Sequence, residues 1–248
     1  MDTLIDEIKK QGYSQNLKLN SEELNTVKYL IEKQAFKHIA STNSLNQQKV
    51  KENKLSLANY HRNFPKIEHA KIWGKENRIL SKFDSDFFLK KDFFRKLNSI
   101  FGHYKISDEM NLGYENFVWR IVRPNSKNDI GPPHRDCWFW DLNPNFPKPK
   151  YKFTRFKVWI PIFCEADLSG LALEPYSHKR VDIEYDTIAK DGINKPRIKK
   201  DQKINLKLIK TNPGDAIIFH DQLLHCGMNK ENASLVRVSI EFTLLVKK

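Results

Sequence analysis

The chain has 248 residues with 40% hydrophobic and 12% aromatic content, which excludes a disordered chain and allows one substantial core. Its 43 Lys and Arg against 30 Asp and Glu leave a formal charge of +13, which fits either an anionic partner or a solubilising surface. Three cysteines without a C-x-x-C pair, no signal peptide and no apolar run of about 18 residues predict a cytoplasmic protein with no transmembrane segment.

The N-terminal part of the sequence predicts helices. Apolar residues recur at helical spacing over residues 20–36, where Asn20 and Glu23 form a capping-box pattern. A second helix is predicted from Ser85 to Phe101, because apolar side chains share one face and Gly102 can end it. Residues 40–65 are polar and without period, so they receive no assignment.

The C-terminal half predicts strands, because short runs rich in Val, Ile, Phe and Trp alternate with turn residues. No βαβ rhythm joins these runs, so we expect an antiparallel barrel or a double-stranded β-helix (jelly roll). The predicted fold is mostly β, with a helical N-terminal region over 1–110 packed on a jelly-roll core over 111–248. The predicted strands are Phe117–Val122, Phe153–Phe163, Asp215–Phe219 and Val236–Val246.

His134 and Asp136 form an H-x-D pattern in the segment GPPHRDCWF. If this segment is extended, both side chains point to one face and can reach one ion, while Arg135 faces away. The pattern is common by chance, so a metal site needs a third ligand.

His225 is the candidate third ligand, since it follows the turn and the buried strand of PGDAIIFHDQLLH. Two imidazoles and one carboxylate leave coordination positions open, as non-haem Fe(II) oxygenases require. A closed zinc site would need four protein ligands. His220 lies in the same segment and is the alternative third ligand.

Arg237 lies in LVRVSIEF on the last predicted strand. A guanidinium can hold a carboxylate through two parallel hydrogen bonds, so Arg237 is a candidate for binding a dicarboxylate whose other end chelates iron. Ser239 shares the face of Arg237 and could add a hydroxyl contact.

Four segments resemble the phytanoyl-CoA dioxygenase-like branch of the Fe(II)/2-oxoglutarate-dependent dioxygenases. They are the H-R-D run, LSGLALEPYSHK at 168–179, PGDAIIFHDQLLH at 213–225, and VRVS at 236–239. The resemblance implies that His134, Asp136 and His225 bind Fe(II) and that Arg237 binds 2-oxoglutarate. One departure concerns the subfamily, because Tyr176 stands where the family more commonly has glycine.

The resemblance also implies the reaction. We expect a hydroxylase that consumes O2 and 2-oxoglutarate, oxidises a substrate C–H bond, and releases succinate and CO2. The substrate is expected to be small and anionic, because residues 148–210 carry 15 Lys and Arg against 8 Asp and Glu. An acidic sugar of a bacterial glycolipid is one alternative, since the Kdo 3-hydroxylase family is similar in size and basic character, and it would allow peripheral contact with an anionic membrane.

Two other functions are weighed against this one. A nucleic-acid oxidative demethylase would suit the charge, but that branch places a second arginine after the one that binds 2-oxoglutarate, and none follows Arg237. A non-catalytic metal-binding jelly roll would not need Arg237. The H-R-D run is also found in protein kinases, but no Gly-rich loop precedes it here and Asp141 stands where an Asn is required.

Several residues near the motifs are open to two interpretations. Trp138, Phe139 and Trp140 could form a substrate pocket or the packing of the barrel rim. At most one of Arg120 and Arg123 is expected to face the cavity. The basic segment after His178, including 195–203, could be a lid or a solvated loop, and Cys137 and Cys226 are expected to pack rather than react.

Overall fold

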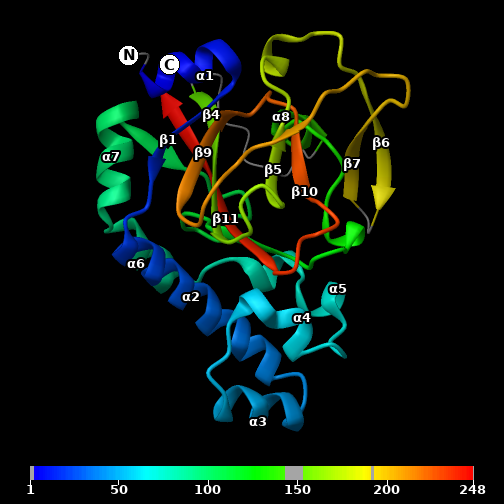
Figure 1. Cartoon of the computed structure of the whole chain (residues 1–248). Helices are drawn as coiled ribbons and strands as arrows, with labels where there is room; N and C mark the ends of the chain where they lie inside the picture. The colour runs from blue at the N-terminus through cyan, green and yellow to red at the C-terminus, as the bar shows by residue number, and fades with distance from the viewer. Residues whose placement is uncertain (1–2, 143–152, 191–192, 248) are drawn as a thin grey trace.

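The computed structural model describes residues 3–142, 153–190 and 193–247 (Figure 1). Two antiparallel sheets form its centre, and helices from the N-terminal part cover one of them. The helices are α1 Leu4–Gln11, α2 Ser21–Ala40, α3 Ser44–Glu52, α4 Tyr60–Asn63, α5 His69–Ile72, α6 Lys82–Leu89, α7 Asp92–Phe101 and α8 Asp136–Leu142. The strands are β1 Tyr13–Lys18, β2 Tyr104–Ile106, β3 Val118–Val122, β4 Phe153–Phe163, β5 Ser169–Leu173, β6 Tyr185–Lys190, β7 Ile193–Ile198, β8 Lys207–Leu208, β9 Asp215–His220, β10 His225–Asn229 and β11 Arg237–Lys247.

The large sheet has the strand order β1-β9-β4-β11-β2, with β3 also paired to β11, and the small sheet has the order β10-β5-β8. The two sheets pack against each other through a shared apolar cluster that includes Trp159, Leu173 and Phe219. This arrangement confirms the predicted jelly-roll fold class. The strands β1 and β2 lie within residues 1–110, so that region contributes two strands of the large sheet in addition to its helices.

Alternation along the central strands separates two environments. In β11, Val238, Ile240 and Phe242 pack into the main core together with residues of α1, α2 and α7. The intervening residues of β11 point to the other face, toward the small sheet, because successive side chains of a strand alternate. The helices therefore cover the outer face of the large sheet, and its inner face is left for a site.

The first predicted helix is confirmed. α2 begins at Ser21, and the Asn20 and Glu23 side chains each accept a hydrogen bond from the backbone N–H of the other residue. Both partners satisfy N–H groups that the first turn leaves free. The helix continues to Ala40, four residues beyond the apolar pattern.

The single helix predicted over 85–101 is wrong, because the structure has α6 and α7 there. Lys91 is extended (φ −74°, ψ 154°) and is the N-cap residue that precedes α7. The backbone N–H of Phe93 donates to the Glu23 carboxylate at 2.7 Å, so a residue of α2 satisfies the start of α7. This contact joins two residues that are 70 positions apart, so the local sequence around α7 does not predict it. Within 40–65, where no assignment was made, the structure has α3, α4 and a short 3₁₀ turn.

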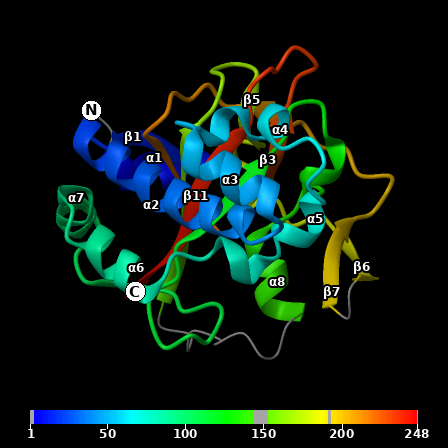
Figure 2. The same cartoon turned by 90° about the horizontal axis from the view of Figure 1, so that it is seen from below.

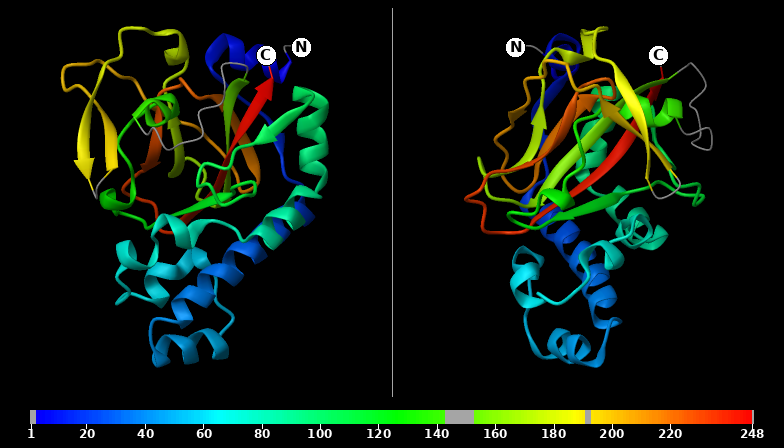
Figure 3. Two further views of the ribbon diagram at one scale, coloured as in Figure 1. Left: turned by 180° about the vertical axis from the view of Figure 1, so that it is seen from behind. Right: turned by 90° about the vertical axis from the view of Figure 1, so that its right-hand side faces the viewer.

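The four predicted strands correspond to β3, β4, β9 and β11, with bounds shifted by at most one residue. The hairpin β6–β7 lies apart from both sheets and packs against α8 (Figure 2). Figure 3 shows most of the helices of the N-terminal part, coloured blue to cyan, gathered below the sheets. None of the described helices is both long and apolar enough to cross a membrane.

Candidate metal centre

The backbone brings His134 and His225 together. The two residues form an isolated antiparallel bridge in which each N–H donates to the carbonyl of the other at 3.0 Å. His225 begins β10, while His134 lies in the segment that leads into α8. Paired residues in an antiparallel bridge carry their side chains on the same face, so both imidazoles point the same way.

Each imidazole is held by its own backbone in the same way. The Nδ1 atom of His134 lies 2.8 Å from the Pro132 carbonyl, and that of His225 lies 2.9 Å from the Leu223 carbonyl. A carbonyl only accepts, so Nδ1–H is the donor in both cases and the neutral ring keeps its lone pair on Nε2. Histidine ligands of metals are commonly oriented by such a bond.

Asp136 completes the group. Its Oδ1 lies 3.6 Å from Nε2 of both histidines, and the candidate ligand atoms of the three residues all lie within 4.8 Å of one another. Its Oδ2 is buried and has no hydrogen-bond partner among the described residues. A carboxylate whose Oδ1 faces two imidazole lone pairs and whose Oδ2 is buried without a partner fits a cation, and this donor set suits Fe(II).

The charges around Asp136 keep it ionised. Burial would raise the pKa of this carboxyl, but the charge of Lys157 and the nearby His225 and His134 hold that pKa below its usual range. Burial lowers the pKa of His225 to about 4. The carboxylate and the neutral imidazole are the protonation states that bind a metal.

The extended backbone on which the H-x-D argument was conditional is not present after His134, since Asp136 is the first residue of α8. The two side chains still meet, because the bend into the helix replaces the expected alternation. Arg135 lies away from the triad, as expected, and its buried guanidinium donates to the carbonyls of Ser177 and Arg180 at 2.6 and 2.8 Å. The segment 177–180 thereby fixes the turn between His134 and Asp136.

Arg237 and Ser239 lie on the inner face of the large sheet. Arg237 is 3% exposed, forms no ion pair with an acid within the described ranges, and donates only weakly to the Ser239 hydroxyl, at 3.3 Å. Burial lowers the pKa of this guanidinium to about 10, and its Nε has no hydrogen-bond partner among the described residues. A buried cation without an acid is costly, so the site is suited to an anionic ligand.

Gly227 gives the Arg237 guanidinium its space. A β-carbon at this position would lie 2.8 Å from Arg237 Nη2. Gly227 is two residues after His225 on β10, so it faces the same interior. The sequence does not reveal this close approach, because β10 and β11 contribute the two residues separately.

Two linked ion pairs continue along the same inner face. Nε and Nη2 of Arg120 lie 2.8 and 2.7 Å from Oε1 of Glu241. Lys157 Nζ lies 3.5 Å from Glu109 and 3.3 Å from the Thr243 hydroxyl, which itself donates to Glu109. Lys157 and Glu241 were not among the predicted site residues, although alternation within the predicted strands places Glu241 on the face of Arg237.

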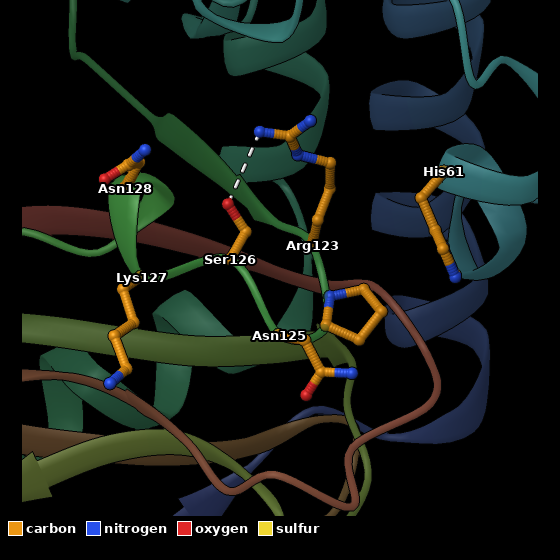
Figure 4. A pocket seen from close by; sticks show the side chains of 7 residues that line it. His61, Arg123, Asn125, Ser126, Lys127 and Asn128 are labelled. Atoms are coloured by element: carbon orange, nitrogen blue, oxygen red, sulfur yellow. Dashed lines mark hydrogen bonds between the residues drawn. The ribbon is translucent and has the colours of Figure 1, made fainter.

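The two candidate arginines, Arg120 on β3 and Arg123 just after it, therefore differ in position. Arg120 points into the interior, whereas Arg123 forms a two-pronged ion pair with Asp129 at 2.8 and 2.9 Å. Figure 4 shows Arg123 with His61 and Ser126 at a surface pocket of about 440 Å³, which shares no residue with the triad. The structure supports the expectation that only one of the two faces the cavity.

The aromatic residues after Asp136 divide between packing and the site. Trp138 and Trp140 are buried, and Trp138 stacks on Tyr185 of the β6–β7 hairpin with ring centroids 4.6 Å apart. Phe139 lies edge-on to His134, at 5.1 Å. Trp138 thus joins the hairpin to the metal segment, and Phe139 contacts the triad through His134.

The alternative ligand His220 lies elsewhere. Its Nδ1 is 3.1 Å from Asp221, and its ring packs against Phe156 rather than against the triad. Cys226 is buried, Cys137 is half-buried, and burial raises the pKa of both thiols, which disfavours the reactive thiolate. Tyr176, at the position where the family more commonly has glycine, has a left-handed backbone (φ 66°).

Known proteins can be compared with this geometry. The family profile described as phytanoyl-CoA dioxygenase matches residues 34–237. The apo structure of the non-haem monooxygenase ThoJ is similar to this chain, with a TM-score of 0.55, 12% identity, and coverage of 99% of this chain and 84% of ThoJ. The non-haem alpha-ketoglutarate-dependent carbocyclase SnoK from nogalamycin biosynthesis has a TM-score of 0.55 at 10% identity, covering 98% of this chain and 83% of SnoK. At these identities the two structures show a shared fold, and no curated protein matches the sequence.

Proposed function

Because the chain belongs to the phytanoyl-CoA dioxygenase family and is thus a non-haem, 2-oxoglutarate-dependent oxygenase, we propose that His134, Asp136 and His225 hold its Fe(II). The observation that carries this proposal is the convergence of the three ligand atoms, with Asp136 Oδ2 buried and unpaired. These three residues would hold the metal and would leave coordination positions open for the cosubstrates. When bound, the metal and cosubstrate supply the oxidising chemistry that the side chains lack.

Arg237 is assigned to the distal carboxylate of 2-oxoglutarate, with Ser239 as a second donor. The guanidinium is buried, lacks an acidic partner among the described residues, and lies on the inner face of the large sheet. Its fork geometry matches a carboxylate, and the absence of water would strengthen the interaction. A non-catalytic metal-binding module would have no use for this residue.

The chain's own residues prepare the site in two ways. The backbone carbonyls of Pro132 and Leu223 orient the two imidazoles, so that Nε2 is available without rearrangement. Lys157 helps keep Asp136 ionised, because its positive charge lowers the pKa of the carboxyl.

The substrate is assigned to the class of small anionic molecules. The formal charge of +13 and the basic segment 148–210 support this assignment, and part of that segment, the β6–β7 hairpin, packs against the helix that begins with Asp136. Local positive charge raises the concentration of an anion near the site. An acidic glycolipid sugar falls within the same charge class.

The test is anaerobic titration of the protein with Fe(II) and then 2-oxoglutarate, followed by visible absorption. Chelation of iron by the keto acid should give a weak charge-transfer band that requires both components. Succinate, which lacks the keto group, serves as the matched control and should give no band. Absence of the band in a protein that retains its melting transition would contradict the proposed function.

A further inference from the structure

Arg120 is an accessible cation on the interior face beside the metal centre. Of the four charged residues in the two linked ion pairs, Glu241, Lys157 and Glu109 have side chains that are 11 to 16% exposed, whereas that of Arg120 is 48% exposed. Its Nε and Nη2 bind a single oxygen of Glu241, and Nη1 has no hydrogen-bond partner in the described parts of the chain. A guanidinium has five N–H donors, so part of Arg120 is available to a ligand.

The position of Arg120 is fixed by the sheet. It lies directly opposite Ser239 across β3 and β11, and its neighbours Trp119 and Ile121 pack into the main core on the other face. Arg120 therefore lies beside the residues assigned to 2-oxoglutarate and faces the interior. The charge of Glu241 is the largest cause of the raised pKa of Arg120, and the Asp136 carboxylate also contributes to raising it.

A purely structural role explains the exposure of Arg120 poorly. Ion pairs inside a protein contribute little net stability, because removing both charges from water offsets their attraction. An arginine that served only to neutralise Glu241 would be expected to use both prongs on both carboxylate oxygens. Here the fork meets one oxygen, and the remaining edge stays open.

We propose that Arg120, positioned by Glu241, binds an anionic group of the substrate beside the metal centre. The group is a carboxylate, phosphate or sulfate, all of which match the planar donors of a guanidinium. This inference rests on the proposed function and names the residue that would select the charge of the substrate. An anion held there would place the carbon skeleton attached to it next to the metal ligands.

The experiment uses the Mn(II)-loaded protein with saturating 2-oxoglutarate and two probe anions, trifluoroacetate and inorganic phosphate. Mn(II) suits the same ligands and broadens the ¹⁹F or ³¹P resonance of a molecule bound nearby. Trifluoroethanol is the neutral control probe. We expect both anions to be broadened in a saturable way and the alcohol to be unaffected.

Three variants separate ligand binding from structure. Arg120→Gln should weaken binding of both anions by at least about tenfold, the loss expected for a charge-assisted hydrogen bond. Arg120→Lys should retain part of it, and the double variant Arg120→Gln/Glu241→Gln should recover stability without recovering anion binding. Arg95→Gln, which changes an exposed ion-paired arginine on α7, is the matched control and should behave as the unmodified protein.

The outcomes that overturn the proposal are distinct. Unchanged broadening in Arg120→Gln would place the anion elsewhere, and recovery of anion binding in the double variant would reduce Arg120 to neutralising Glu241. If 2-oxoglutarate displaces the probes and Arg120→Gln weakens 2-oxoglutarate binding tenfold, Arg120 holds the cosubstrate instead. Mn(II) binding is measured first by electron paramagnetic resonance, so its absence would count against the metal centre itself.

Discussion

His134 and His225 lie opposite each other and exchange both backbone hydrogen bonds, although 91 positions separate them in the sequence. The bridge holds their two Cα atoms together independently of the side chains. The proposed metal centre is thus built on backbone pairing, and its ligands can be replaced without removing the contact that brings them together.

Alanine at His134, Asp136 or His225 should abolish Fe(II)-dependent turnover and weaken metal binding by well over about 100-fold, since each removes one of three ligands. The folded state should persist, because the backbone bridge remains. Metal titration and thermal melting measure the two effects. His220→Ala is the matched control, and loss of iron binding in that variant alone would transfer the third ligand to His220.

Arg237→Lys should weaken 2-oxoglutarate binding by about tenfold or more while leaving Fe(II) affinity nearly unchanged. Lysine keeps the positive charge but loses the fork that meets a carboxylate with two hydrogen bonds. The charge-transfer band, titrated with 2-oxoglutarate at fixed Fe(II), gives the affinity. Equal affinity in both proteins would refute the assignment of Arg237 to the cosubstrate.

Gly227→Ala should also weaken 2-oxoglutarate binding and leave iron binding intact. The added carbon would lie 2.8 Å from Arg237 Nη2, so the guanidinium must move from its present place. Gly131→Ala is a matched control, because a β-carbon there meets nothing within 4 Å among the described atoms. Identical cosubstrate affinities for the two variants would show that Arg237 does not need its present position.

Tyr176→Gly should be more stable than Tyr176→Ala by about 0.5 to 1 kcal/mol, because only glycine adopts a left-handed backbone without strain. The native residue has φ 66° and is 53% exposed, so both variants lose a similar, small contact. Urea denaturation at equal protein concentration measures the difference. A more stable alanine variant would show that strain at this turn is negligible.

His69 should make folding stability depend on pH. Burial lowers the pKa of its imidazole from 6.5 to about 4, although Asp129 opposes the shift. Between these values the unfolded chain binds a proton that the folded protein does not, so stability should fall as pH falls from 6.5 to 4, by up to about 3 kcal/mol from this group. His69→Gln should lose less stability than the unmodified protein over the same interval, as measured by denaturation at each pH. Parallel curves would exclude this contribution.

Much of the fold follows from local patterns. The strands β3, β4, β9 and β11 coincide with apolar runs, and the start of α2 coincides with its capping residues. The break between α6 and α7 was not predictable, since it depends on a contact from Glu23, 70 positions away. β1 was also missed, because its pairing with β9 is decided by the sheet rather than by its own polar sequence.

For the candidate site, the sequence predicts which residues come together better than it predicts the backbone geometry that positions them. The triad was predicted from ligand chemistry and motif order, while the bend at Asp136 that brings it together was not. The interior charges of Lys157 and Glu109 come from β4 and from the loop after β2, so their meeting is a property of the tertiary structure. Such contacts between distant segments have no single-sequence pattern.

β11 is the latest of the described strands in chain order and also the inner strand of the large sheet, paired with β4 on one side and with β3 and β2 on the other. Among the described strands, β3 joins the sheet only through β11. During synthesis, β2 and β3 therefore stay unpaired until residues 237–247 have left the ribosome. Such non-local pairing slows folding. Since Arg237 lies on the same strand, a nascent chain acquires its complete sheet and the residue proposed to bind 2-oxoglutarate in one step.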